Sequence, residues 1–169
     1  GFYHREDLEY VNEYCKEKGI TVIPEIETPG HAEALIAAYP EFGCTGNKID
    51  VQNNWGVFEN VMNPSSPQLW VFLDAAIKEL SSIFDGPFIH IGGDECPHTQ
   101  WEDHEGCKAI MAENGLSDTS ELQGWFTSCV SEIVKKYGKR AIGWDEVVDA
   151  PEIDKDVVVM SWRGLNGAR

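Results

Sequence analysis

The sequence has few basic residues and no long apolar run. Its 169 residues include 13 Lys and Arg against 29 Asp and Glu, which gives a formal net charge of −16 at pH 7. Because nucleic acids and anionic membranes are bound by basic surfaces, this balance argues against both as partners. No apolar stretch approaches the roughly 18 residues of a membrane span, and no secretory signal is present. With 42% hydrophobic residues, the chain has enough apolar side chains for one core.

The five cysteines lack the spacing of a metal finger, and their odd number prevents complete internal pairing. Cys15 and Cys129 fall within helical patterns and are predicted to be buried small apolar residues. Cys44, Cys96 and Cys107 lie in or beside loop-like sequence, where a Cys44–Cys96 disulfide is one pairing that the positions allow. No glycine-rich dinucleotide-binding fingerprint follows any predicted strand.

Helical and strand patterns alternate along the chain. Leu8, Val11 and Cys15 have helical spacing, and Gly19 is a suitable end for that helix. The other predicted helices span 31–38, 67–84, 105–114 and 119–137, and the predicted strands span 20–23, 88–91, 141–144 and 157–161. Residues 40–64 are rich in turn-forming residues and predict a long loop, a feature that is commonly functional.

This alternation predicts four parallel strands joined by right-handed crossovers. A doubly wound sheet and a barrel both satisfy it, but the positions of polar and aromatic residues favour the barrel. Each strand leads into candidate site residues: Glu25 and Glu27, Asp94 and Glu95, Trp144 and Asp145, Trp162 and Arg163. In a (β/α)8 barrel, the carboxyl ends of the strands converge on the active site, and a complete barrel needs about 250 residues. We therefore expect part of a (β/α)8 barrel, taken from a longer protein.

The segment from Phe88 to Glu95 is the most informative part of the chain. A short apolar strand leads into two glycines and then into two adjacent carboxyl groups, Asp94 and Glu95. Glycine permits unusual backbone dihedrals and close approach of a ligand. Two acids at a strand end can have different catalytic roles, in which one donates a proton and the other remains ionised. Taken alone, Asp-Glu is more often an acidic turn.

The hexapeptide His90-Ile-Gly-Gly-Asp94-Glu95 resembles the active-site signature of the family 20 glycoside hydrolases, the β-N-acetylhexosaminidases. Three further segments resemble motifs of that family, in the family's order: Pro24–His31, Ile142–Glu146 and Val159–Trp162. The resemblance implies that residues 1–169 form part of a single catalytic domain, from about strand three to strand six. The family's strand-one arginine, strand-two acidic motif and the site residues of strands seven and eight are absent. An isolated fragment is therefore expected to be inactive.

The resemblance also implies a chemistry. The family hydrolyses terminal N-acetylglucosamine or N-acetylgalactosamine from β-glycosides with retention, and the substrate's own 2-acetamido oxygen is the nucleophile. Glu95 is then expected to be the acid for the leaving oxygen and later the base towards water. Asp94 is expected to stabilise the oxazolinium, and His31 to orient Glu95. No cofactor and no metal are implied, and the parent protein is expected in the periplasm, in a lysosome or outside the cell.

Further residues are expected around the two acids. At barrel-strand ends, Trp144 and Trp162 are expected to form walls against the pyranose ring and the acetamido methyl, and Asp145 is a candidate acceptor for sugar hydroxyls. His90 lies inside a strand and is predicted to be an interior histidine. One of Glu25 and Glu27 is expected to support the site. The other tryptophans are predicted to pack: Trp55, Trp70, Trp101 and Trp125.

Three alternatives stay open at this level. A second enzyme class would use a divalent metal held by acidic and histidine side chains: Glu25, Glu27, His31, His90 and Asp94. No two of those histidines have helical ligand spacing, and metal analysis of the parent protein would separate the cases. The second alternative is a non-catalytic sugar-binding module, although two intact acids argue against it. The third is another specificity within the family, such as release of a disaccharide.

Overall fold

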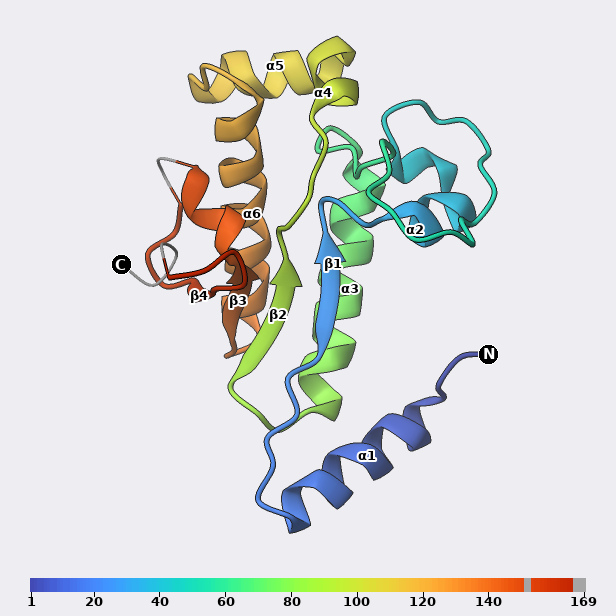
Figure 1. Cartoon of the computed structure of the whole chain (residues 1–169), viewed down its shortest axis with the longest axis vertical. Helices are drawn as coiled ribbons and strands as arrows, with labels where there is room; N and C mark the ends of the chain where they lie inside the picture. Colours follow the sequence, from blue (N-terminus) through green and yellow to red (C-terminus); the bar gives the residue numbers. More distant parts are fainter. Residues whose placement is uncertain (151–152, 166–169) are drawn as a thin grey trace.

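The computed structural model describes residues 1–150 and 153–165, which form a four-stranded sheet with helices against one face (Figure 1). The strands are β1 (Glu25–Thr28), β2 (Phe88–Gly92), β3 (Arg140–Trp144) and β4 (Val158–Met160). All three neighbouring pairs are parallel, and the order in the sheet is β1-β2-β3-β4. The predicted parallel arrangement of adjacent strands is therefore confirmed.

Helices connect the strands, and the two longest cover one face of the sheet. They are α1 (Arg5–Glu17), α2 (Glu33–Ala38), α3 (Pro67–Ile83), α4 (Thr99–Asp103), α5 (Glu105–Asn114) and α6 (Thr119–Lys136), with short 3₁₀ helices η1 (Pro40–Phe42) and η2 (Asp145–Asp149). Helices α3 and α6 contact the sheet, α1 lies beyond the amino ends of the strands, and α2, α4 and α5 lie at the carboxyl ends (Figure 1). Within the described ranges, none of these helices is both long and apolar enough to cross a bilayer.

The two long helices owe their position to an apolar side chain at every fourth residue. In α3 these include Leu69, Leu73 and Ile77, each fully buried. Helix α6 has the same spacing in Leu122, Phe126, Val130 and Val134. Such spacing places the side chains on one stripe, and the stripes pack against outward-facing strand residues such as Ile89 and Ile91. Ser66-Pro67 precedes and begins α3 as predicted.

The opposite face of the sheet carries the polar and aromatic residues of the candidate site. Paired residues of neighbouring parallel strands share a face, and the register pairs Glu25 with His90, His90 with Ile142 and Trp144 with Met160. In a closed (β/α)8 barrel, this face is the interior. Here it is partly open, and Met160 is 37% exposed. The sheet is thus a section of barrel wall with its helices outside.

The first strand is displaced from its predicted position. Ile20 and Ile23 of the predicted strand 20–23 are 58% and 38% exposed, and the strand itself is Glu25–Thr28. The prediction followed the β-branched residues, but sheet hydrogen bonding begins at the Pro24 carbonyl, which accepts from the His90 amide at 2.9 Å. Consequently Glu25 and Glu27 lie within the strand and not after it.

Other helices and loops of the structure also differ from the predicted elements. Helix α2 begins at Glu33, which leaves His31 in the preceding turn, and α4 and η2 were not predicted. The predicted loop 40–64 contains η1 and is fixed at its far end, because Met62 is 1% exposed and bridges to Gly43. The Trp101 indole donates to the Met62 carbonyl at 2.9 Å. The loop is thus attached to the core beside the site.

The cysteines are all free thiols, so the Cys44–Cys96 disulfide is not formed. Both residues pack in a small apolar cluster around Trp101 and the buried Cys107. Contact with Cys107, together with burial, raises the pKa of the Cys44 thiol. Cys15 and Cys129 are half-buried and not fully buried as predicted. Cys15 is only half-buried because its helix, α1, packs against α3 beyond the end of the sheet.

Candidate active site

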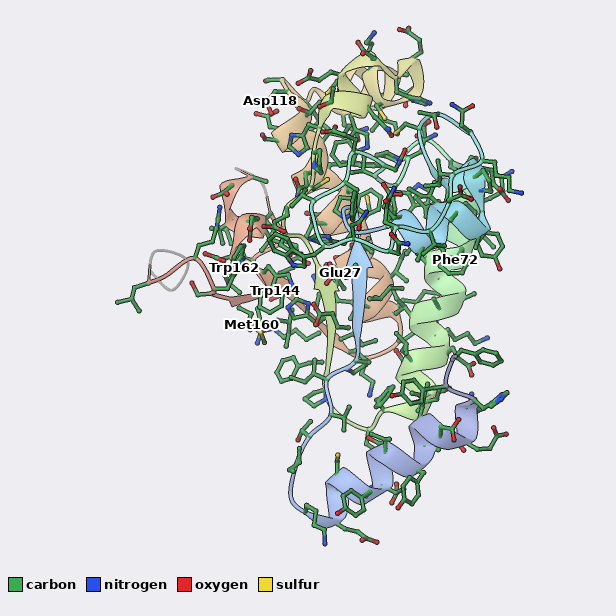
Figure 2. All side chains as sticks on the ribbon, turned by 45° about the vertical axis from the view of Figure 1, so that its right-hand side comes forward. Glu27, Phe72, Asp118, Trp144, Met160 and Trp162 are labelled. Atoms are coloured by element: carbon green, nitrogen blue, oxygen red, sulfur yellow. The ribbon has the colours of Figure 1, made fainter. Side chains whose placement is uncertain are left out.

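A cavity of about 410 Å³ opens at the carboxyl ends of the strands. Its lining consists of Glu25, Glu27, His31, Trp55, Asp94, Glu95, Trp144 and Trp162. Every catalytic candidate and both aromatic walls predicted from the sequence are therefore brought together, although they come from four separate segments. Figure 2 shows Glu27, Trp144 and Trp162 near one another at this end of the sheet. The volume lies in the range of small-molecule sites.

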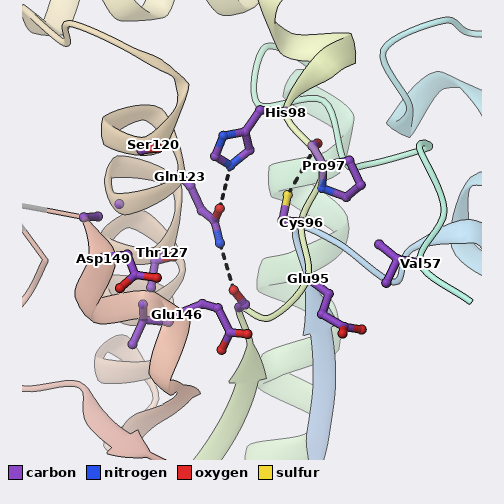
Figure 3. Close-up of a pocket in the computed structure, with 14 residues that line it drawn as sticks. Val57, Glu95, Cys96, Pro97, His98, Ser120, Gln123, Thr127, Glu146 and Asp149 are labelled. Atoms are coloured by element: carbon purple, nitrogen blue, oxygen red, sulfur yellow. Dashed lines mark hydrogen bonds between the residues drawn. The ribbon is translucent and has the colours of Figure 1, made fainter. Parts of the chain in front are cut away.

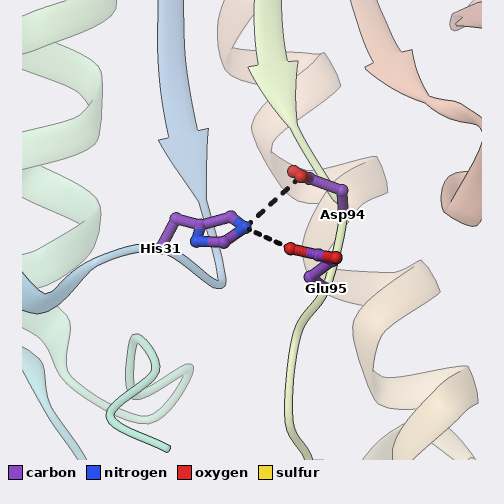
Figure 4. Close-up of side chains that lie close together, drawn as sticks. All are labelled: His31, Asp94 and Glu95. Carbon is purple, nitrogen blue, oxygen red and sulfur yellow. Dashed lines mark ion pairs between the residues drawn. The ribbon is translucent and has the colours of Figure 1, made fainter. Parts of the chain in front are cut away.

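One imidazole faces both acids. The Nε2 atom of His31 lies 3.3 Å from Oδ2 of Asp94 and 3.3 Å from Oε2 of Glu95 (Figure 4). The Asp94 side chain is 17% exposed, whereas that of Glu95 is 39% exposed. The acid that is expected to meet the leaving group is thus the more accessible one, and its neighbour lies deeper in the wall.

Strained backbone accompanies these side chains. His31 and Glu95 have φ angles of 50° and 43°, which are uncommon for residues with a Cβ atom. Gly92 also has a left-handed backbone, with a φ of 74°. A Cβ at Gly92 would collide with the Glu27 carboxyl and lie 3.0 Å from the Thr28 amide nitrogen. The glycine therefore allows β1 and its carboxyl group to approach the end of β2 closely.

Helix α6 holds the segment that carries the two acids. Gln123 donates from Nε2 to the Gly93 carbonyl at 2.8 Å, and its Oε1 lies 2.7 Å from His98 Nε2 (Figure 3). Since Oε1 accepts, the His98 proton is on Nε2. Gln123 also lines a second cavity of about 480 Å³ next to Glu95. Nothing in the sequence pointed to Gln123, because its partners are distant in the chain.

A second set of contacts fixes Trp144. Its indole donates to Oε1 of Glu25 at 3.1 Å, and its ring centroid lies 4.6 Å from that of His90. The Gly92 amide donates to His90 Nδ1 at 3.1 Å, so the ring proton lies on Nε2. Burial lowers the pKa of His90, which is 2% exposed. The interior position predicted for His90 is confirmed, and Glu25 provides polar support to an aromatic wall.

Asp145, the candidate acceptor for sugar hydroxyls, is buried and hydrogen-bonded within the protein. It is 2% exposed and accepts from the Trp162 amide at 3.2 Å and from Arg163 Nε at 3.3 Å. Burial opposes ionisation, but these backbone and guanidinium donors lower the pKa of Asp145. Its oxygens are occupied within the protein, so it positions the turn after β4. Trp162 itself is 51% exposed, and its indole donates to Glu146 Oε2 at 2.9 Å.

Trp55 is a site residue that the sequence did not reveal. It was expected to pack, but it is 100% exposed and lines the cavity from the long loop. The packing expected for the other loop and helix tryptophans is found: Trp101 is fully buried, and Trp70 and Trp125 contact the core. Its place in the turn-rich segment 40–64 was the available signal for exposure, since such a segment offers a tryptophan few packing partners.

Metal-ligating side chains also meet here. One ligand atom from each of His31, Asp94 and Glu95 lies within 4.8 Å of the others. The metal cluster considered from the sequence shares His31 and Asp94 with this trio. Its other members, Glu25, Glu27 and His90, are not in the trio, and Glu95 is added. Exposed acidic groups are common without an ion. The same three groups also constitute an acid, a neighbouring anion and a histidine that contacts both.

Comparison with known proteins identifies the family. Residues 1–169 match the family model described as "Glycosyl hydrolase family 20, catalytic domain". The chain belongs to this family. A β-hexosaminidase of Porphyromonas gingivalis is 40% identical over 167 residues, which cover 99% of this chain and 21% of that protein.

Solved structures of family 20 agree with this assignment. The chitobiase of Flavobacterium johnsoniae is 33% identical with a TM-score of 0.90, over 98% of this chain and 25% of that one. An exo-β-N-acetylglucosaminidase of Vibrio harveyi, in complex with N-acetylglucosamine, is 34% identical with a TM-score of 0.86, over 99% of this chain and 26% of that one. The four strands are therefore part of the family 20 (β/α)8 barrel. The chain spans about a quarter of the length of these relatives.

Proposed function

We propose that the protein to which this chain belongs is a β-N-acetylhexosaminidase. It removes terminal N-acetylhexosamine residues from β-glycosides through an oxazolinium formed by the substrate's own acetamido group. The observation that carries the proposal is the His31–Asp94–Glu95 contact at the strand ends of a family 20 barrel. The Vibrio harveyi relative, whose structure contains N-acetylglucosamine, supports a 2-acetamido sugar as the ligand.

Each side chain has a distinct part in this mechanism. Glu95 protonates the leaving oxygen and then removes a proton from the attacking water. Asp94 accepts a hydrogen bond from the acetamido nitrogen as positive charge develops there, and His31 keeps both acids in place. Because the nucleophile belongs to the substrate, no enzyme carboxylate has to attack. Trp144 and Trp162 bound the sugar, and Asp145 acts indirectly, since it holds the Trp162 amide.

We propose further that residues 1–169 are part of a single catalytic domain. Strands β1 and β4 form the two edges of the described sheet, and the inner face is open. Unpaired edges and exposed apolar surface favour aggregation. The 169-residue chain by itself is therefore expected to be poorly stable and inactive. Turnover of an aryl N-acetylglucosaminide by the purified chain, at a rate near that of the full-length protein, would contradict this.

The function is tested by turnover and by product stereochemistry. The full-length protein is expected to hydrolyse a nitrophenyl β-N-acetylglucosaminide and to release the β-anomer first, because two inversions at the anomeric carbon give retention. Proton NMR during the first minutes of reaction distinguishes the anomers before mutarotation. Release of the α-anomer first would mean direct attack by water, and absence of turnover on any 2-acetamido glycoside would overturn the proposed activity.

A further inference from the structure

The segment that carries the two acids has no regular structure of its own. Residues 93–98 lie between Gly92, the last residue of β2, and Thr99, the first residue of α4. Neither a strand ladder nor a helix therefore fixes their backbone. Within this segment, Glu95 has a φ of 43°. A residue with a Cβ atom keeps such a conformation only where surrounding contacts hold it there.

The turn that carries His31 packs closely against this segment. A Cβ at Gly30 would lie 3.1 Å from the Asp94 carbonyl oxygen and 3.2 Å from the Cα atom of Cys96. The missing side chain at Gly30 thus lets the two backbones approach each other. Contact of this kind limits the translation of the segment, but it does not set the direction in which a peptide group points. A hydrogen bond does so, because its strength depends on angle.

Gln123 of α6 supplies directional contacts. Its Nε2 donates to the Gly93 carbonyl at 2.8 Å, and its Oε1 accepts from His98 Nε2 at 2.7 Å (Figure 3). Gly93 and His98 are the first and the last residue of segment 93–98. One side chain therefore joins both ends of the segment, with Asp94 and Glu95 between them. Because the Gly93 carbonyl can only accept, the amide group of Gln123 has a single suitable orientation.

The core holds the Gln123 amide in place from both sides. The His98 ring stacks on that of Trp101, with centroids 5.3 Å apart and an angle of 11° between the planes. Trp101 is fully buried, and so are Leu122 and Phe126, which lie beside Gln123 in α6. The amide is thus fixed by its own helix and by a histidine that rests on a core tryptophan.

We propose that Gln123 is a positioning residue, which fixes the Gly93 peptide group and thereby sets the directions of the Asp94 and Glu95 side chains. This proposal rests on the proposed function, in which both acids act on a bound 2-acetamido sugar. Gln123 acts through the backbone, and His98 acts through Gln123. Because a misplacement of about 1 Å can lower a rate about 10²-fold, a single amide contact has a measurable effect.

Gln123→Met in the full-length enzyme removes both hydrogen bonds and keeps a side chain of similar length. It is expected to lower kcat by about 10- to 100-fold for both N,N′-diacetylchitobiose and a dinitrophenyl β-N-acetylglucosaminide, because the segment carries both acids. KM is expected to change little, since Trp144 and Trp162, which bound the sugar, belong to other segments. Steady-state kinetics on the two substrates measure this division.

Gln123→Glu separates positioning from packing. When the introduced carboxyl group is protonated, it can donate to the Gly93 carbonyl and accept from His98, as the amide does. When it is ionised, it has no donor and its charge faces the carbonyl oxygen. The ratio of variant to wild-type kcat is therefore expected to approach one at low pH and to fall by about 10- to 100-fold as the carboxyl group ionises. A packing role predicts a ratio that does not depend on pH.

The surroundings of Gln123 set the pH range of this fall. An unperturbed glutamate has a pKa of about 4.3. Among the described residues that line the adjoining cavity, Glu95, Glu146 and Asp149 favour the protonated form of the introduced group, whereas His98 favours the ionised form. The ratio is therefore expected to fall between about pH 4 and pH 7. Gln68→Glu, the same change on the exposed surface of α3, is the matched control, and its ratio is expected to stay level.

His98→Phe tests the other end of the contact. It keeps a ring that can stack on Trp101 and removes the donor to Gln123. This variant is expected to lower kcat less than Gln123→Met does, because the amide still reaches the Gly93 carbonyl. If both residues act through one contact, the double variant is no slower than Gln123→Met alone. Losses that multiply would overturn the part assigned to His98.

Failure of this inference can be distinguished from failure of the proposed function. If the function is wrong, the wild-type protein does not hydrolyse 2-acetamido glycosides at all. If the inference alone is wrong, the wild type is active, and either Gln123→Met keeps the wild-type kcat or the ratio for Gln123→Glu is independent of pH. If Gln123→Met does not fold, the pH dependence of Gln123→Glu still decides the matter, because it compares two protonation states of one folded protein.

Discussion

Glu95→Gln in the full-length enzyme is expected to lower kcat/KM for N,N′-diacetylchitobiose by about 10²–10⁴-fold, the usual contribution of general acid catalysis. A sugar is a poor leaving group, and its oxygen must receive a proton as the glycosidic bond breaks. A dinitrophenyl leaving group departs as a stable anion, so kcat/KM for that aryl glycoside is expected to change far less. The measurement is a pair of steady-state kinetic profiles, one for each substrate.

The same variant also separates the two steps. Glu95 is the base towards water in the second step, so kcat for the dinitrophenyl substrate is expected to fall although kcat/KM is spared. Glu102→Gln, a similar change on the exposed surface of α4, is the control and is expected to leave both parameters unchanged. An equal loss of kcat/KM on both substrates would show that Glu95 is not the proton donor.

Asp94→Asn is expected to lower kcat/KM by about 10²–10³-fold on both substrates, which is the usual loss when one preorganised electrostatic group is removed. Charge develops on the acetamido nitrogen whatever the leaving group is, so the loss should not depend on the leaving group. This independence distinguishes Asp94 from Glu95. Asp103→Asn, on the exposed surface of α4, is the matched control.

A substrate with a 2-hydroxyl in place of the 2-acetamido group tests the same step from the substrate's side. It lacks the internal nucleophile and is expected to react at least about 10⁵-fold more slowly, because effective molarities of oriented intramolecular groups reach that size. The comparison uses matched nitrophenyl glycosides and the wild-type enzyme. Equal rates would mean that a carboxylate of the enzyme attacks directly, which would make Asp94 a nucleophile.

The sequence pattern was sufficient for the general architecture. Apolar residues at every fourth position in α3 and α6, together with short β-branched strands, predicted parallel strands covered by helices. These signals are local, because they depend on the period of a helix or a strand. The boundary of β1 was wrong for the same reason. The apolar run 20–23 has strand character, but pairing with β2 decides which residues enter the sheet.

The candidate site was also predicted in part from local motifs and decided in part by contacts between distant segments. The order of motifs indicated His31, Asp94, Glu95, Trp144 and Trp162, and all five line one cavity. Asp145 follows β3 as a candidate should, yet it is turned inward by Arg163 and the Trp162 amide. Gln123 gave no distinguishing local pattern, because its significance lies in a contact with Gly93, which is thirty residues away in the chain.

By itself, the sequence determined the alternation of helices and strands, the acidic surface and the motifs that place the chain in family 20. Each of these follows from the type and spacing of neighbouring residues. Only the tertiary structure decided that one histidine faces both acids, that Asp145 is buried, and that Trp55 lines the cavity from a distant loop. These properties depend on desolvation and on distances between segments far apart in the chain, and neither quantity is set until the strands have paired.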